Sequence, residues 1–295
     1  MKKIAYISGG IGGAKLAKGF YALKDIELSI VVNTGDDEII HGVKLSPDVD
    51  SVMYALANMQ GDLGWGQKDD TFEVSNFYKE YHKQQFSIGD KDLALKLYRN
   101  QMLNEGKNLT EVTKFFTDFY KLRCRILPMT NDVVSTSVTT DNNEVLSFQE
   151  YFVERRAEPA LKEVSYNGSS DVSPTNDVIK ALSEADKIII GPSNPVLSIG
   201  PILSIDSIKN ILSKHPSVTV ISPFINQKAL KGPSARNFID LGLEPNINGL
   251  QEFYGGIVNE YIVHENESSG INIQSKNILF SDEIIAANLA KELIK

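Results

Sequence analysis

The sequence predicts an α/β fold: a Rossmann-like, mostly parallel sheet with helices on both faces and an inserted helical region. Its first part reads as strand, helix, strand, because two apolar runs, Ile4–Ile7 and Leu28–Val32, flank the helical pattern Leu16–Leu23. Similar runs follow at Lys187–Ile190 and Val218–Ser222. Unbroken apolar runs are typical of parallel strands that are buried on both faces.

The composition is that of an ordinary globular protein, and 295 residues suffice for one elaborated domain or for two. The net charge of −8 argues against binding to nucleic acid, although backbone dipoles can still hold a single nucleotide. One cysteine and four scattered histidines give no intrachain disulfide and no histidine-built zinc site. No apolar run approaches the ~20 residues of a membrane span, and the N-terminus reads as a strand rather than a signal peptide. We therefore expect a cytoplasmic protein without a membrane partner.

A glycine loop joins the first strand to the first helix. Glycines lack the Cβ atom that would hold a ligand away, so we expect four of them to let backbone N–H groups approach a phosphate. These are Gly9, Gly10, Gly12 and Gly13. The loop fits neither standard fingerprint, because Lys15 replaces the third glycine of G-x-G-x-x-G and no Gly-Lys-Ser/Thr is present. A tight strand-to-helix turn without a ligand is the alternative.

Acidic residues follow the second strand. Asp36 and Asp37 come at its carboxyl end, where doubly wound sheets bind ligands. Such a pair can hold a ribose hydroxyl or a divalent metal, and a solvated turn is the alternative. Ser46 is the expected N-cap of the next helix. The dipole of that helix alone explains Asp48, whereas Asp50 flanks the apolar face and is the better candidate for a functional residue.

Residues 60–125 are expected to form a helical insertion within a single α/β domain, residues 1–295, and to cap the ligand edge of the sheet. Helical stretches with no clear strand between them support this expectation: Phe72–Tyr81, Asp90–Leu103 and Thr110–Tyr120. Asp90 is the expected N-cap of its helix. Lys91 follows in the first turn, where the dipole disfavours a cation, which hints at a role toward a ligand. An ordinary exposed lysine is the alternative.

The rest of the chain alternates between strands and helices. The expected strands are Arg125–Leu127, the hairpin Thr136–Thr139 with Val145–Phe148, Lys162–Tyr166 and Tyr261–Val263. The expected helices are Phe148–Arg156, Asn176–Ser183, Ser204–Leu212, Leu250–Tyr254 and Ser281–Ile294. Ser193 and Asn194 lie between two prolines, in a stiff loop at another carboxyl strand end. We expect them to reach a phosphate or carboxylate rather than to form only a turn.

Six stretches together carry a resemblance to one family. In chain order they are SGGIGGAKL (8–16), VNTGDD (32–37), SPDVDS (46–51), GDKDLA (89–94), LPMT (127–130) and GPSNP (191–195) with Ser198-Ile199. The chain resembles the 2-phospho-L-lactate transferases of coenzyme F420 biosynthesis from residue 4 to about residue 255. One such motif is weak, whereas six in the same order are specific.

The resemblance implies a Rossmann-like core with an inserted helical region. It also implies transfer of a phosphorylated three-carbon acid (2-phospholactate, phosphoenolpyruvate or a phosphoglycerate) from a guanosine diphosphate-activated donor. The acceptor is the terminal ribityl hydroxyl of the deazaflavin FO, GMP leaves, and magnesium is needed. The implied partners are therefore small molecules and a second copy of the chain in a homodimer. The only tryptophan, Trp65, is expected either to stack on the deazaflavin or to pack in the core.

By position, Asp50 matches the family aspartate that contacts the acceptor, and Lys91 matches its basic partner, so both are expected to be catalytic. The glycine loop and Ser193-Asn194 match the stretches that contact nucleotide and phosphate. Asp37 and Asp50 are the carboxylates expected to bind Mg²⁺. A water-exposed aspartate is a weak base at neutral pH, so orientation or metal binding is the expected role of Asp50. Asn131 departs from the family, because many members have an aspartate there.

Other classes remain open. A nucleotide-sugar-binding regulator of related fold without transferase activity is one, and Asp50 together with GDKDLA favours the transferase over it on resemblance alone. A dinucleotide-dependent oxidoreductase is disfavoured by the incomplete glycine fingerprint. A protein–protein module is disfavoured by the buried-strand pattern and the stiff polar loops.

Overall fold

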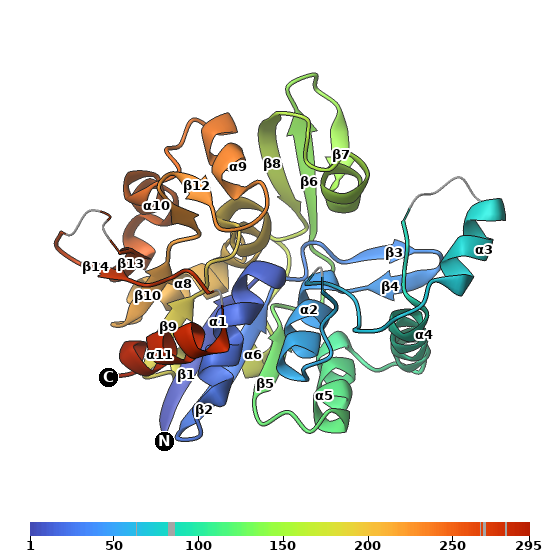
Figure 1. Cartoon of the computed structure of the whole chain (residues 1–295), viewed down its shortest axis with the longest axis horizontal. Coiled ribbons are helices and arrows are strands. Elements are labelled where there is room, and N and C mark those ends of the chain that lie inside the picture. The colour runs from blue at the N-terminus through green and yellow to red at the C-terminus, as the bar shows by residue number, and fades with distance from the viewer. Residues whose placement is uncertain (63, 82–85, 266, 268–269, 281) are drawn as a thin grey trace.

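The computed structural model of the protein describes residues 1–62, 64–81, 86–265, 267, 270–280 and 282–295. At its centre is a seven-stranded sheet in the order β14-β13-β10-β9-β1-β2-β5, in which every neighbouring pair is parallel. Helices cover both faces of this sheet (Figure 1). The predicted α/β fold class is confirmed.

Six of the seven central strands match predicted apolar runs, whereas β14 was not predicted. The seven strands are β1 (Lys2–Ser8), β2 (Ile26–Val32), β5 (Arg125–Pro128), β9 (Lys187–Ile190), β10 (Val218–Ile221), β13 (Glu260–His264) and β14 (Ile273–Lys276). Three small antiparallel sheets accompany them. They consist of β3 (Glu38–Ile40) with β4 (Val43–Leu45), β11 (Phe224–Ile225) with β12 (Lys228–Ala229), and β6 (Ser135–Thr140) with β7 (Val145–Ser147) and β8 (Leu161–Asn167).

Eleven α-helices are described. They are α1 (Ile11–Ala22), α2 (Pro47–Leu56), α3 (Glu73–Tyr81), α4 (Asp90–Asn104), α5 (Leu109–Phe119), α6 (Asn176–Ser183), α7 (Gly200–Leu203), α8 (Asp206–Lys214), α9 (Ser234–Asp240), α10 (Ile247–Tyr254) and α11 (Glu283–Leu293). Short helical turns occur at η1 (Glu150–Glu154), η2 (Pro195–Ile199) and η3 (Gly255–Ile257). Helices α3 to α5 fall in the predicted insertion and lie on the β5 side of the molecule (Figure 1). That this insertion caps the ligand edge stays a prediction.

Within the described ranges, no single helix is long and apolar enough to cross a membrane. One pair, Pro195–Leu203 with Asp206–Lys214, passes that test of length and composition together, and it is bent by 91°.

The sheet has a topological switch point between β1 and β9. These strands are neighbours, but the chain leaves β1 toward β2 on one side and leaves β9 toward β10 on the other. In doubly wound sheets, ligands bind outside the carboxyl ends of the strands at such a point. The glycine loop follows β1 and the stiff loop 191–195 follows β9. The fold therefore brings together two loops that the sequence had singled out separately.

Each face of the sheet carries its own apolar core. Ile4 and Tyr6 of β1 contribute to the core beneath α1, α2 and α11, whereas Ala5 and Ile7 contribute to the core on the opposite face. Successive side chains of a strand point to opposite faces, so a sheet that is covered twice needs apolar residues at every position. This burial explains why the strands read as unbroken apolar runs.

Helix α1 starts at Ile11, earlier than the predicted start at Leu16. Its first turn contains Gly12 and Gly13, which have low helix propensity, so periodicity alone places the start too late. A Cβ atom on Gly12 would lie 2.9 Å from the Pro192 carbonyl oxygen, and one on Gly13 would lie 2.8 Å from Ser193 Oγ. Close packing of α1 against the loop after β9 therefore requires the glycines.

Candidate active site

The glycine loop packs against the start of α2. A Cβ atom on Gly10 would collide with Asp48 Oδ1, and one on Gly9 would collide with Ser198. The Gly10 backbone amide lies next to the Asp48 carboxylate and favours its charged form. Asp48 thus lies at the N-terminal end of α1, where the helix dipole stabilises an anion. The glycines are required for this packing, and their contact with a substrate phosphate stays a prediction.

Asp36 and Asp48 form an acid pair around Asn33, in which Asp36 is buried and Asp48 is half-buried. The Asn33 side-chain amide donates to Asp36 Oδ1 (3.2 Å) and to Asp48 Oδ2 (2.9 Å). Burial raises the pKa of Asp48 to about 6. Burial, together with the charges of Asp48 and Asp37, raises the pKa of Asp36 well above its ordinary value. Full ionisation of this cluster is therefore unfavourable without a compensating cation.

Asp37 belongs to the same turn after β2. Its Oδ2 accepts a hydrogen bond from Ser46 Oγ (2.8 Å) and lies 3.3 Å from Lys44 Nζ. Its Oδ1 is buried and has no hydrogen-bond partner in the part of the chain that the structure describes. Burial raises the pKa of Asp37 to about 6, although Lys44 and Ser46 act in the opposite direction. Ser46 occupies the predicted N-cap position of α2, but its hydroxyl binds Asp37 instead of a helix amide.

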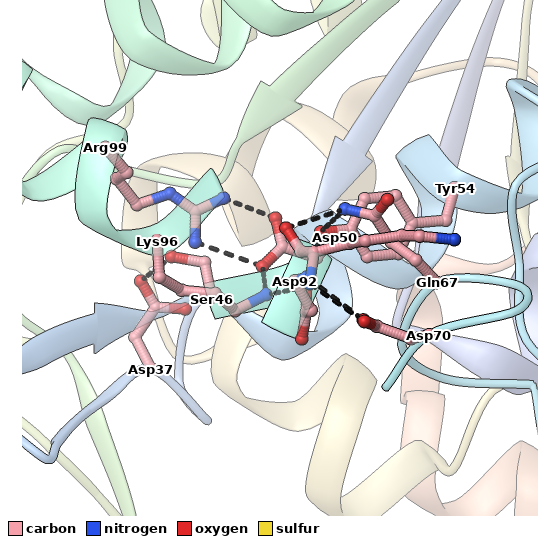
Figure 2. A network of polar contacts seen from close by, with 10 residues as sticks. Asp37, Ser46, Asp50, Tyr54, Gln67, Asp70, Asp92, Lys96 and Arg99 are labelled. Atoms are coloured by element: carbon pink, nitrogen blue, oxygen red, sulfur yellow. Dashed lines mark hydrogen bonds and ion pairs between the residues drawn. The ribbon is translucent and has the colours of Figure 1, made fainter. Parts of the chain in front are cut away.

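Asp50 has the opposite environment, because two buried cations bind it. Arg99 contacts both of its carboxylate oxygens, and Lys96 Nζ lies 2.8 Å from Oδ2 (Figure 2). All three side chains are at most 4% exposed. Burial alone would raise the pKa of Asp50, but the charges of Arg99 and Lys96 outweigh it and hold that pKa below its ordinary value. The expectation of a water-exposed aspartate is therefore wrong: Asp50 is buried and held ionised.

Lys91 makes none of the contacts described for Asp50. It is exposed, and its Nζ donates to the carbonyl oxygens of Asp69 (2.5 Å) and Lys68 (3.3 Å). The cations that face Asp50 come from later turns of the same helix, α4. A catalytic role of Lys91 stays a prediction, and its place in the first turn of α4 is explained by its bonds to the preceding loop.

Two carboxylates join α3 to α4: Asp90 in the GDKDLA stretch and Asp70 in the loop before α3. We call this pair the aspartate clasp. Asp90 accepts hydrogen bonds from two backbone N–H groups at the start of α3, each 3.0 Å long. Asp70 accepts from two at the start of α4, at 2.8 and 3.1 Å. Helix starts leave such N–H groups unpaired, so each acid caps one helix. Asp90 therefore caps α3 and not its own helix, and Gly89 is required because a Cβ atom there would collide with the Asp70 carboxylate.

Ser193 and Asn194 follow the carboxyl end of β9, as predicted, and the order of the strands places this end at the switch point. Ser193 Oγ accepts a hydrogen bond from the Gly9 N–H (3.0 Å), which ties the loop after β9 to the glycine loop. Asn194 Oδ1 accepts from two N–H groups at the start of η2 (3.0 and 3.1 Å), and its Nδ2 donates to Asn237 Oδ1 (2.8 Å). Both side chains therefore have structural roles, and their contact with a ligand stays a prediction.

The loop before α3 approaches the first residue of α1. It is closed by a hydrogen bond from the Gly64 N–H to the Gly61 carbonyl (2.9 Å) and by one from Gln60 Nε2 to the Gly64 carbonyl (2.7 Å). A Cβ atom on Gly64 would lie 2.7 Å from Ile11 Cγ2. Trp65, in the same loop, is 46% exposed, so the expected alternative of core packing is wrong.

Several residues at this edge were not identified from the sequence: Asn33, Thr34, Asp48, Lys96, Arg99 and Thr136. Lys96 and Arg99 have the i, i+3 spacing of one helix face, a signal that the sequence contained. Their partner on another helix was not visible in any local pattern. From the sequence alone, the dipole of its own helix explains Asp48. In the structure, the Asp48 carboxylate lies at the N-terminus of α1 and interacts with the dipole of that helix.

Together these features define an α/β protein with a buried acidic centre at the switch point of a doubly wound sheet. The chain matches the family model described as 2-phospho-L-lactate transferase CofD over residues 4–282. It is 37% identical to the 2-phospho-L-lactate transferase of Methanopyrus kandleri, over 99% of this chain and 97% of that protein. It is 35% identical to that of Methanocaldococcus jannaschii, over 88% and 85% of the two chains. The chain belongs to the 2-phospho-L-lactate transferase family.

A solved structure supports the fold independently. The chain superimposes on a UPF0052-family protein from Bacillus halodurans with a TM-score of 0.69, covering 100% of both chains. The sequences are 16% identical, so the likeness concerns the fold alone.

Proposed function

We propose that this chain transfers a phosphorylated three-carbon acid from a guanosine diphosphate-activated donor to the terminal ribityl hydroxyl of the deazaflavin FO. GMP leaves, and the reaction belongs to coenzyme F420 biosynthesis. The observation that carries this proposal is the nearly full-length similarity to relatives named 2-phospho-L-lactate transferase. The acidic centre at the β1/β9 switch point supports it, because small-molecule substrates bind at such points.

Magnesium fits one part of the acidic centre. Asp37 offers a buried carboxylate oxygen without a partner in the described chain, and Asp36 and Asp48 add negative charge nearby. No group of three or more His, Cys, Asp or Glu side chains within the described ranges is arranged as a metal site. Mg²⁺ is often held by one or two carboxylates together with substrate phosphates, so Asp37 can serve without such a group. Asp50, the other predicted ligand, fits poorly because two cations already bind its oxygens.

Bound Mg²⁺ would neutralise charge on the donor's pyrophosphate. The chain's own residues then have to orient the acceptor hydroxyl in line with the phosphorus and keep water out. Asp50 is suited to orientation rather than to proton removal, because its lowered pKa makes it a poor base at neutral pH. Wild-type turnover in Asp50→Asn, with magnesium and both substrates present, would remove Asp50 from this mechanism.

The experiment combines the protein with FO, magnesium and one guanylated donor at a time, carrying lactate, enolpyruvate or glycerate. We expect a new deazaflavin product whose mass identifies the transferred acid, and an equal amount of GMP. A protein that forms no product with any of the three donors would contradict the proposal. A nucleotide-sugar-binding regulator would in addition leave the absorbance and fluorescence of FO unchanged.

A further inference from the structure

The turn after β2 is held by the Asn33 side chain and by β6. The Gly35 N–H donates to Asn33 Oδ1 (2.8 Å), and the Thr136 N–H donates to the Gly35 carbonyl (2.7 Å). A Cβ atom on Gly35 would lie 2.7 Å from Pro201 Cβ and 2.8 Å from Thr136 Oγ1, so the turn is packed between these side chains. The Thr136 hydroxyl therefore lies directly against the turn, at the carboxyl end of β2.

Three side-chain oxygens at this turn have no hydrogen-bond partner among the residues described: Thr34 Oγ1, Asp37 Oδ1 and Thr136 Oγ1. All three side chains are nevertheless buried, with exposed fractions of 3% for Thr34, 6% for Asp37 and 2% for Thr136. A buried hydroxyl without a partner is unfavourable, and nearly all such groups in native proteins are satisfied. Three of them on one turn and on the strand bonded to it indicate a binding site.

The surrounding charges decide which ligand fits this turn. Asp36 and Asp37 belong to the turn itself, and Asp48 shares the Asn33 amide with Asp36. Lys44 is the cation beside Asp37, and three acids outnumber it, so a bare phosphate or carboxylate is disfavoured at this turn. A hydroxyl group can accept a hydrogen bond from one threonine and donate one to another oxygen, so it suits a set of threonine and carboxylate oxygens. A ligand that carries several hydroxyls matches the turn better than an anion does.

We propose that Thr34 and Thr136 bind hydroxyl groups of the acceptor and position it at the carboxyl end of β2. This subsite rests on the proposed transfer to a polyhydroxylated acceptor. It assigns the acceptor to the β2 side of the switch point and leaves the β9 side, with Ser193, to the donor.

The test replaces each threonine by valine, which keeps the shape of the side chain and removes the hydroxyl. In Thr34→Val and Thr136→Val the KM for FO is expected to rise roughly 3- to 10-fold, as for the loss of one hydrogen bond, while the KM for the donor stays unchanged. The melting temperature without substrates should stay equal or rise, because no hydrogen bond within the protein is lost. Thr136→Ser keeps a hydroxyl and should restore the KM for FO.

Thr113 provides a matched control. It lies on α5, is 2% exposed, and its Oγ1 likewise has no partner in the described ranges. Thr113→Val removes the same kind of buried hydroxyl away from the turn, so both KM values should remain those of the wild type.

An unchanged KM for FO in both folded valine variants would overturn the subsite, since the hydroxyls would then serve an internal water. A lower melting temperature in both variants would also overturn it, because it would reveal a partner within the protein. Failure of the wild-type protein to form product with any donor concerns the proposed function instead. FO binding, followed by its fluorescence in the wild type and the valine variants, tests the subsite in that case as well.

Discussion

Asp48 and Asp50 are two residues apart on α2, yet their surroundings shift their pKa values in opposite directions. Asp50 is buried and Asp48 is half-buried, and removal from water disfavours the charged form of each carboxylate. Arg99 and Lys96 more than compensate this effect at Asp50, whereas Asp48 faces the neutral Asn33 amide and another acid. The identity of the neighbouring side chains therefore decides which carboxylate keeps its charge.

Asp50→Asn should strongly destabilise the protein. The change leaves Arg99 and Lys96 buried without their carboxylate, and breaking a buried ion pair lowers the free energy of unfolding by about 3–5 kcal/mol. Urea denaturation measures the change. Asp118→Asn is the control, because its ion pair with Lys114 is 65–71% exposed and should contribute less than about 1 kcal/mol. A loss at Asp50 as small as that of the control would contradict the buried network.

Asp48→Asn should stabilise the protein at neutral pH in the absence of divalent cations. The pKa of Asp48 is about 6 in the folded protein and about 4 in the unfolded chain. The stability that the protonated Asp48 carboxyl group contributes is therefore fully present below about pH 4 and is lost as the pH rises through about 6. An asparagine does not ionise and escapes this loss. Thermal melts should therefore show a higher melting temperature than the wild type at about pH 7.5 and little difference at about pH 4. An equal difference at both values would contradict the assigned titration.

At the scale of elements, the sequence located six of the seven central strands because burial on both faces leaves an unbroken apolar signal. The edge strand β14 is polar and only partly buried, so it carries no such signal and was not predicted. The start of α1 was placed too late, since Gly12 and Gly13 are helical for reasons of packing that lie outside the helix. The β3–β4 hairpin was not predicted, because strands of three residues are too short for an alternating pattern. Local sequence patterns thus predicted the elements that are determined by their own residues, and they missed features that depend on packing against distant residues.

The aspartate clasp couples α3 to α4, and Gly89→Ala should disrupt its hydrogen bonds to the starts of both helices. The added Cβ atom displaces the Asp70 carboxylate, so the start of α4 loses its cap, and the neighbouring Asp90 shifts with it. Loss of a cap is worth about 1 kcal/mol, which corresponds to roughly fivefold faster hydrogen exchange of the affected amides. Hydrogen–deuterium exchange should show this at the starts of both helices.

Single changes at the two acids separate the two halves of the clasp. Asp90→Ala should accelerate exchange at the start of α3 alone, and Asp70→Ala at the start of α4 alone. Identical exchange patterns in Gly89→Ala and the wild type would show that the clasp does not hold these helices.

At the scale of the whole molecule, the beginning and the end of the chain pack together. Lys2 donates to the Ile294 carbonyl, and the N- and C-terminal ends lie near each other (Figure 1). A Cβ atom on Gly19 of α1 would collide with the Ala286 carbonyl of α11. The glycine loop opens the same helix α1, so the site and the C-terminal helix share one supporting element.

Gly19→Ala should therefore lower the free energy of unfolding by about 1–3 kcal/mol, as is usual for overpacking in a close helix contact. Gly256→Ala is the matched control, because nothing lies within 4 Å of a Cβ atom at that position. Denaturant titration of both variants measures the difference, and equal stabilities would contradict the close contact between α1 and α11.

The location of the candidate site could be predicted from the sequence, but the side chains that bind one another within it could not. Strand ends and stiff polar loops placed the glycine loop, Asp36 and Ser193 at one edge, because parallel strands share a carboxyl side. Lys91 was chosen as the partner of Asp50 from one stretch of sequence, whereas the cations that bind it are Lys96 and Arg99. Partner choice depends on how α2 and α4 are placed in three dimensions, and no spacing within either helix records that placement.

Trp65 provides an intrinsic fluorescence probe at a single position of the protein. It is the only tryptophan, it is 46% exposed, and its loop touches the first residue of α1 through Gly64 and Ile11. Intrinsic tryptophan emission therefore arises from one place, next to the helix that carries the glycine loop. Ligand titrations can be followed there without a label, and the same emission separates local change at low denaturant from global unfolding at high denaturant.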